Sequence, residues 1–464
     1  MRRFQSLTGL LALALSFAAC NGVSNSSSST PPQNTQGQVF ATGEDAPVSS
    51  VVAFNITINS ITLNNSTTTA QVLSTPTTVD FGRLVGLRSL LGFNAVAPGT
   101  YTSATFTFAA SNPAPSINYV DLTTNPPSIG TAAGTLSSPT VTVSFPAGAP
   151  LVVGSNGLAG LHIDFDLRQS LAMDGSGNLT INNGTIAVTP VLDVMAVSAA
   201  GDLGQITEFG GNIVSVNTSG NSFVIQGPYG FQETIDVNSS TLYNGSNSLS
   251  SLIANGIVSV EGTVQADGSI LASSVELITT DQAFISGRIL AVSPGPVVTM
   301  FVGEELGTSA TIPVDSVYTV DLSLVSQYDI CFIDNWFTNE LFSGSSLVVG
   351  QRIFVGGTYQ SNAFTPDMVS LRRQGVIGSL VTNSVNITSG NLGSYQMQND
   401  LLMSYSAGGP FTVYTGNLTT FVNINGLTGL QAAGATNLIS RGLVFYDPNT
   451  QKPIVWAGRV RVLP

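Results

Sequence analysis

The catalytic and metal-binding chemistry open to this sequence is limited by its single histidine, His162. Asp164 and Asp166 follow it at intervals of two, between apolar neighbours. If residues 161–167 form a strand, the three polar side chains share one face. An imidazole and two carboxylates could bind a metal ion there. The solvent-facing side of an ordinary strand has the same pattern, and we favour that second interpretation, with no metal and no cofactor.

Other catalytic arrangements find little support. A Ser–His–Asp triad would need His162, and no Gly-x-Ser-x-Gly turn occurs in the sequence. The stretch from Asp174 to Asn178 resembles the start of a calcium loop, but Leu179 stands where such a loop requires glycine. We therefore interpret it as a hairpin turn and predict that the protein is not an enzyme.

The segment 322–342 is the least repetitive part of the chain and combines aromatic with acidic residues. Trp336 and Phe337, beside Asp334, could form a platform for a sugar, because aromatic faces suit carbohydrates. Two carboxylates could instead act as an acid/base pair, as in glycosidases, and plain packing of an insertion is the third possibility. The carboxylates of this segment are Asp329, Asp334 and Glu340.

The composition indicates β-structure throughout. Hydrophobic residues make up 43% of the 464 residues and charged residues only 8%, while Thr, Ser, Val and Ile are frequent. We predict an all-β protein: a Greek-key β-sandwich over residues 48–200, then three tandem small OB-like β-barrel repeats. The repeats are placed at 204–279, at 282–374 with the insertion 322–342, and at 375–464.

The first strand of the predicted sandwich shows where its register changes. Ile56 and Ile58 alternate with polar residues, and the apolar phase then moves to Ile61 and Leu63. A change of phase within one strand indicates a β-bulge, here near Ser60.

Two parts of the chain resemble known families. Five motifs follow one another in the first part: Phe54–Leu63, Val79–Leu84, Ala97–Thr102, Ile163–Ser170 and Thr189–Leu192. With these motifs, residues 48–198 resemble domain-of-unknown-function family 4382, which implies secretion and a sandwich fold but no established activity. The second part opens with Gln205–Asn217. Residues 204–277 resemble family 5666 of the same class, which implies a five-stranded barrel like the oligonucleotide/oligosaccharide-binding fold.

The N-terminus has the features of a secretory signal: Arg2 and Arg3, then an apolar run that is too short to span a bilayer. The run ends at Cys20 in a sequence that resembles the lipobox of bacterial lipoproteins. That resemblance implies a signal peptide over 1–19, acyl chains on Cys20 and a flexible linker over 20–47. It places the protein on the bacterial cell envelope, and Asn21 favours the outer membrane.

The charge balance limits the partners. The chain has 13 Lys+Arg against 26 Asp+Glu, a net charge of −13, so a basic surface for nucleic acid is absent. The leading hypothesis is a non-catalytic, lipid-anchored envelope protein that binds or scaffolds, with the membrane and an envelope glycan or protein as partners. The alternatives are a polysaccharide-binding protein and a carboxylate-based hydrolase.

Overall fold

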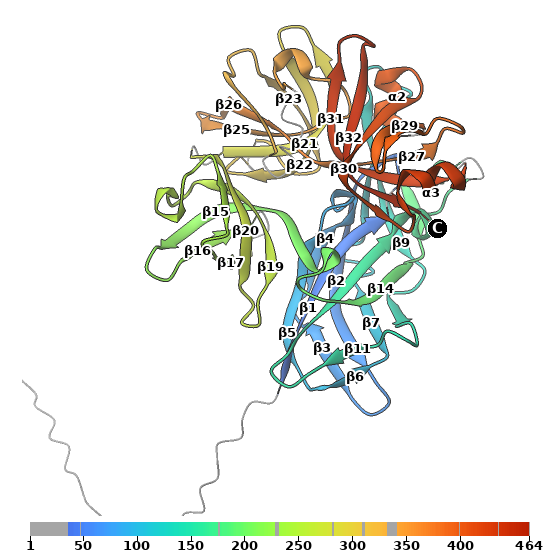
Figure 1. Cartoon of the computed structure of the whole chain (residues 1–464), viewed down its shortest axis with the longest axis vertical. Helices are drawn as coiled ribbons and strands as arrows, with labels where there is room; N and C mark the ends of the chain where they lie inside the picture. Colours follow the sequence, from blue (N-terminus) through green and yellow to red (C-terminus); the bar gives the residue numbers. More distant parts are fainter. Residues whose placement is uncertain are drawn as a thin grey trace, which may run out of the picture. The chain divides into compact units, whose positions relative to one another are not determined.

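The computed structural model describes residues 36–463, apart from positions 47, 175–176, 228–231, 281–282, 309–310, 332–340, 399 and 435. The predicted signal peptide and Cys20 therefore lie outside the described residues, as do Asp334, Trp336 and Phe337. The described chain is all-β, as predicted, and its strands follow the colour order of Figure 1 from the blue sandwich to the red third repeat.

Two β-sheets form the N-terminal sandwich. The first has the strand order β14-β12-β1-β5, and the second has the order β10-β7-β2-β8-β9-β13, with β3 and β4 also paired to β2. A small third sheet pairs β11 with β6. The strands are β1 (Gly37–Ala46), β2 (Val51–Asn64), β3 (Thr69–Leu73), β4 (Thr77–Asp80), β5 (Ser89–Val96), β6 (Gly99–Tyr101), β7 (Ser103–Phe108), β8 (Ser116–Asp121), β9 (Ser128–Leu136), β10 (Thr140–Ser144), β11 (Leu151–Val153), β12 (Leu158–Asp166), β13 (Thr185–Val188) and β14 (Leu192–Val197), with the short helices η1 (Phe81–Arg83) and α1 (Leu167–Ser170).

Side chains from both sheets share one apolar core. The ring of Phe165, on β12, lies 5.2 Å from that of Phe54 and 6.0 Å from that of Phe108, on two strands of the other sheet. The predicted bulge is confirmed, because the pairing of β2 with β7 shifts register between Ile58 and Ser60.

The strand β1 corrects the predicted linker of residues 20–47. It begins at Gly37 and runs between β12 and β5, and Val39, Phe40 and Ala41 are fully buried. Gly, Gln and Thr residues flank these three and interrupt the apolar pattern. For that reason the composition of the segment is typical of a flexible linker. The central position in the sheet makes this segment part of the core.

The first and third repeats close into barrels with the same connectivity. Each barrel has five main strands besides one short additional strand, Leu242–Asn244 in the first repeat and Asn386–Ser389 in the third. Of the five main strands, the first pairs with the second and fourth, and the third pairs in parallel with the fifth. This order, 1-2-3-5-4-1, is that of an OB-like barrel. The first repeat consists of η2 (Asp202–Gly204), β15 (Gln205–Asn217), β16 (Ser222–Gln226), β17 (Gln232–Asp236), β18 (Leu242–Asn244), η3 (Leu249–Ser251), β19 (Ile257–Val264) and β20 (Ile270–Thr279); the third of β27 (Gln374–Leu380), β28 (Asn386–Ser389), β29 (Leu392–Gln398), α2 (Leu401–Ala407), β30 (Phe411–Val422), α3 (Gly426–Ala433), β31 (Asn437–Asp447) and β32 (Lys452–Val462).

The second repeat has the same central strands in the order β23-β22-β21-β25-β26-β24. Its pairings within the described residues do not include one between β23 and β26, so the sheet is open there. It consists of β21 (Ala283–Ser293), β22 (Val297–Leu306), β23 (Ser316–Asp321), β24 (Gln327–Ile330), η5 (Gly344–Ser346), β25 (Arg352–Gln360) and β26 (Ala363–Leu371).

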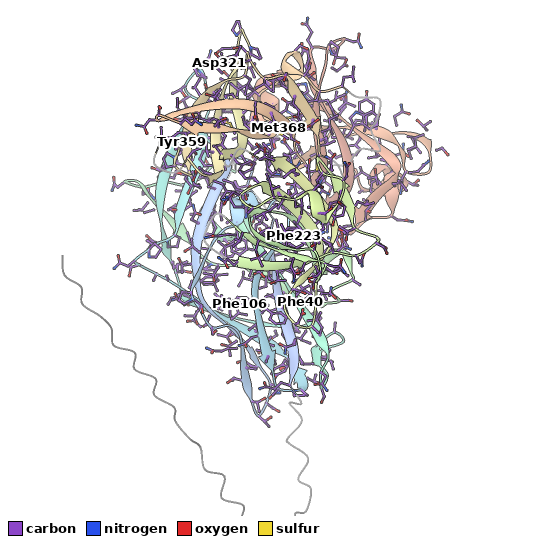
Figure 2. The ribbon with its side chains drawn as sticks, turned by 90° about the vertical axis from the view of Figure 1, so that its left-hand side faces the viewer. Phe40, Phe106, Phe223, Asp321, Tyr359 and Met368 are labelled. Carbon is purple, nitrogen blue, oxygen red and sulfur yellow. The ribbon has the colours of Figure 1, made fainter. Side chains whose placement is uncertain are left out.

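Apolar contacts join the sandwich to the repeats, although each sheet of a repeat takes strands from that repeat alone. Phe40 of the sandwich belongs to the same buried cluster as Phe223 in the first barrel, and Figure 2 labels both side chains. Val85 of the sandwich packs against Ile377 and Ile439 of the third repeat. The sandwich therefore shares apolar clusters with the first and third repeats.

Candidate functional site

Ionised side chains gather where the sandwich meets the three repeats, and we call this set the ionic junction. The chain has 13 basic residues, two of which are Arg2 and Arg3, and nine of the remaining 11 lie here. Its arginines are Arg83, Arg88, Arg288, Arg352, Arg372, Arg373, Arg441, Arg459 and Arg461. Its carboxylates are Glu44, Asp164, Asp202, Glu208, Glu261, Glu276, Glu304 and Asp400.

The first half of the junction joins the sandwich to the third repeat through Glu44, on β1. An oxygen of this carboxylate lies 3.3 Å from Arg459 Nη1, on β32, and the other lies 3.8 Å from Arg88 Nη1. Burial opposes ionisation of Glu44, but the two arginines outweigh it and lower the pKa of this carboxylate. Glu44 is therefore a buried anion that links the sandwich to the third repeat.

His162, Asp164 and Asp166 do not lie on a solvent-facing strand, as the sequence pattern had led us to expect. His162 and Asp164 are buried, because β32 of the third repeat supplies partners above them. Asp164 is 2.6 Å from Arg461, whereas His162 Nδ1 is 3.2 Å from the Thr42 hydroxyl. Asp166 caps α1 by accepting from the Gln169 N–H.

These three residues thus have separate partners and do not converge on one point. Among the residues that the structure describes, no group of three or more His, Cys, Asp and Glu side chains is placed to hold a metal ion. Burial lowers the pKa of His162 to about 4, so its imidazole is neutral at pH 7. Burial raises the pKa of Asp164 to about 6, against the opposing effect of Arg461.

The second half of the junction surrounds Glu208, on β15. This residue has φ 50°, in the left-handed region, at a register shift between Ile206 and Phe209. A bulge of this kind redirects a side chain. The carboxylate forms an ion pair with Arg352 and lies 3.5 Å from Arg372 and 3.6 Å from Arg373.

The arginines around Glu208 come from the second repeat and its connection to the third, so this carboxylate binds the repeats to one another. Burial opposes its ionisation, but Arg352, Arg372 and Arg373 outweigh that effect and lower the pKa of Glu208. Cys331 Sγ is buried at 3.7 Å from Glu208 Oε1, consistent with an S–H donor.

A cavity of about 290 Å³ lies beside the junction, between β3 to β5 of the sandwich and the first barrel, with Glu304 of the second repeat at its wall. Its apolar surface includes leucine and phenylalanine side chains: Leu73, Leu84, Leu87, Leu90, Leu91, Phe93 and Phe209. Its ionisable groups are Asp80, Arg83, Glu208, Glu233 and Glu304.

Two of the cavity's carboxyl groups titrate near neutrality. Burial raises the pKa of Asp80 to about 7, with a further contribution from the charge of Asp315. Burial also raises the pKa of Glu233 to about 7. Asp80 Oδ1 accepts a hydrogen bond from the Phe54 N–H at 2.8 Å, which fixes the side chain. Both groups are therefore partly protonated at pH 7 and can donate as well as accept hydrogen bonds.

Sequence reasoning missed Asp80 and Glu233 as lining one cavity, since they are 153 positions apart and belong to different sheets. The available signal for Asp80 was its position between the apolar residues Val79 and Phe81, in the motif Val79–Leu84. Of the carboxylates singled out in the insertion, Asp329 lies on β24, half-buried.

The comparisons with known proteins follow this division of the chain. Residues 37–183 match a domain of unknown function (DUF4382). Residues 210–276 match a second domain of unknown function (DUF5666). Both resemblances expected from the sequence, and their order, are thereby confirmed, and the DUF4382 match begins where β1 does. No curated protein matches the chain. In the part of the chain that the structure describes, no helix is long and apolar enough to cross a membrane.

Proposed function

We propose that the protein is a non-catalytic, lipid-anchored binding protein of the bacterial cell envelope, with the 290 Å³ cavity as its ligand site. The observation that carries this proposal is the cavity's construction. Apolar side chains, a few polar groups and two carboxyls with perturbed pKa values converge at the meeting of four sheets. The ionic junction beside it holds these walls in fixed positions, so ligand binding would require little ordering of the protein.

The cavity's chemistry favours a neutral, hydroxyl-rich ligand, and we propose a sugar unit of an envelope glycan. Partly protonated Asp80 and Glu233 can each exchange hydrogen bonds with hydroxyl groups. Phe93 and Phe209 offer aromatic surface for the apolar face of a sugar ring. The neighbouring Arg83 forms an ion pair with Glu304. Its charge is therefore already balanced and does not favour an anionic ligand.

We expect Glu233→Gln and Phe93→Ala each to weaken glycan binding by about tenfold or more, as expected for losing a hydrogen bond or an aromatic contact. A glycan array would identify the ligand, and calorimetric titration of the full chain would give the affinities. Asp267→Asn is the matched control, because Asp267 is exposed on the same barrel. Equal affinities for all variants would contradict this site.

The insertion 322–342 remains the second place where a glycan could bind, through Trp336, Phe337 and Asp334. The same titration decides between them. If Trp336→Ala weakens binding and Phe93→Ala leaves it unchanged, the ligand site lies in the insertion.

Anchoring by Cys20 is the other part of the proposal, supported by the charged and apolar pattern that precedes this residue. We expect Cys20→Ala to move the protein from the membrane fraction to the soluble fraction, because the acyl chains can then no longer be attached. Fractionation followed by a high-salt wash measures this. Retention of the variant in the washed membranes would mean that something other than the lipid holds the protein.

A carboxylate-based hydrolase is a second candidate, favoured by one specific observation. Asp80 and Glu233 line the same cavity, and a carboxyl with a pKa near 7 is suited to act as a general acid at neutral pH. Incubation with any glycan that binds, followed by assay of newly formed reducing ends, tests it. Release that Asp80→Asn abolishes would establish hydrolysis, whereas binding without release favours the non-catalytic proposal.

A further inference from the structure

A second, more polar pocket of about 160 Å³ lies at the edge of the ionic junction. Its walls come from η2, from the connection between β26 and β27, and from β30, β31 and β32 of the third repeat. Leu418 and Thr420 are exposed at its rim, so the pocket is open to solvent. The charged side chains that line it are Asp202, Arg373, Arg441 and Arg459, three cations and one anion.

Arg441 is the unusual member of this set. It is 7% exposed, and its Nε and Nη2 atoms have no hydrogen-bond partner among the described residues. No carboxylate of the described chain lies within ion-pair distance of it. At longer range, the charge of Arg441 contributes to lowering the pKa of Asp202. Its aliphatic stem packs against Gly86, where an added Cβ would lie 3.1 Å from Arg441 Cδ. The sandwich therefore packs against the stem that carries this guanidinium to the pocket wall.

The surrounding charges increase the positive potential at this point. Burial lowers the pKa of Arg88 to about 10, and Arg441 contributes to that lowering. Burial and Arg441 likewise lower the pKa of Arg373 to about 9. Both groups remain cationic at pH 7. The junction as a whole holds nine arginines against eight carboxylates, an excess of one positive charge in a chain of net charge −13.

A buried guanidinium without a partner is costly, and an anion in the pocket would remove that cost. We infer that this pocket is a binding site for a small oxyanion of the phosphate or sulfate type. Arg441 is its principal ligand, because its N–H donors are unused and the planar guanidinium matches such oxygens. Arg373 and Arg459 add charge, and the Thr420 side chain stands at the entrance.

The bound anion would join three parts of the chain: η2, the β26–β27 connection and the third repeat. It differs from the proposed glycan site in its residues and in the charge of its ligand, so either proposal can fail without the other. The phosphate group could be free or part of an ester, and two probes separate these sources: inorganic phosphate and glycerol phosphate.

The test is calorimetric titration of the full chain with each probe, together with thermal melting in phosphate and in chloride at equal ionic strength. We expect binding with a Kd tighter than about 1 mM and a higher melting temperature in phosphate. Tighter binding of inorganic phosphate assigns a free ion, and tighter binding of glycerol phosphate assigns an ester. No binding tighter than about 1 mM for either probe would overturn the site.

Variants identify the ligand residue. Arg441→Gln should weaken binding by at least about tenfold, as expected for losing a hydrogen bond between charged groups. Arg168→Gln removes the same charge from α1, outside the junction, and should change nothing. In chloride alone, Arg441→Gln should melt at the same temperature as the natural protein or higher, because it removes an unpaired buried charge. A lower melting temperature in chloride, or unchanged phosphate binding, would contradict the inference.

Discussion

Replacing Glu208 with glutamine should lower the free energy of unfolding by about 3–5 kcal/mol, the range seen when one partner of a buried ion pair is removed. The carboxylate is shared by Arg352, Arg372 and Arg373, all of them buried. The amide fills the same space but leaves these cations with one negative charge fewer. Denaturant unfolding of the full chain measures the change.

The control for this variant is Asp193→Asn, which removes the same charge from an exposed position on β14. It should change the free energy of unfolding by less than about 0.5 kcal/mol. If Glu208→Gln is as mild as this control, the ionic junction does not contribute to stability in the way described here.

The stability of the protein should be greatest at about pH 5. Below that value, Glu44 and Glu208 dominate, because their pKa values in the folded protein are lowered from the ordinary 4.5. Such groups stabilise the fold above their unfolded pKa, and that contribution is lost as the pH falls toward their folded pKa. His162 acts in the same direction between about pH 6.5 and pH 4, since burial keeps it neutral while the unfolded chain takes up a proton.

Above pH 5 the cavity carboxyls act in the opposite direction. The pKa values of Asp80 and Glu233 are raised to about 7, so the folded protein holds protons that the unfolded chain has released. Their contribution is complete below the unfolded pKa and is lost as the pH rises through about 7. Asp80→Asn should therefore flatten the decline between pH 5 and pH 8 by about 2–4 kcal/mol. Denaturant unfolding across this range tests it, and an Asp80→Asn curve parallel to that of the natural protein would contradict the account.

The sequence was sufficient for the features that repeat along a strand or between domains. Alternating Ile56 and Ile58 predicted a strand, and the change of phase to Ile61 located its bulge. The order of a sandwich and OB-like barrels was also predicted, since turn signals and matching segments recur at regular spacing.

The junction could not be predicted, because it depends on how the sheets pack against one another. The alternation along β12 placed His162 and Ile163 on opposite faces of the strand, but it could not show that the third repeat covers the polar face. Glu208 and Arg373 are far apart in sequence, and nothing local distinguishes either from a surface residue. The low charge content of the chain was the available signal. Because the protein has so few arginines for its size, each arginine was a candidate for a specific ion pair.

Differential scanning calorimetry of the full chain at pH 7 tests the central claim most directly, namely that the ionic junction and the shared apolar clusters make the sandwich and the three repeats one structural unit. We expect a single transition for residues 36–463 whose calorimetric and van't Hoff enthalpies agree. Two or more resolved transitions, with the first barrel melting apart from the sandwich, would contradict it.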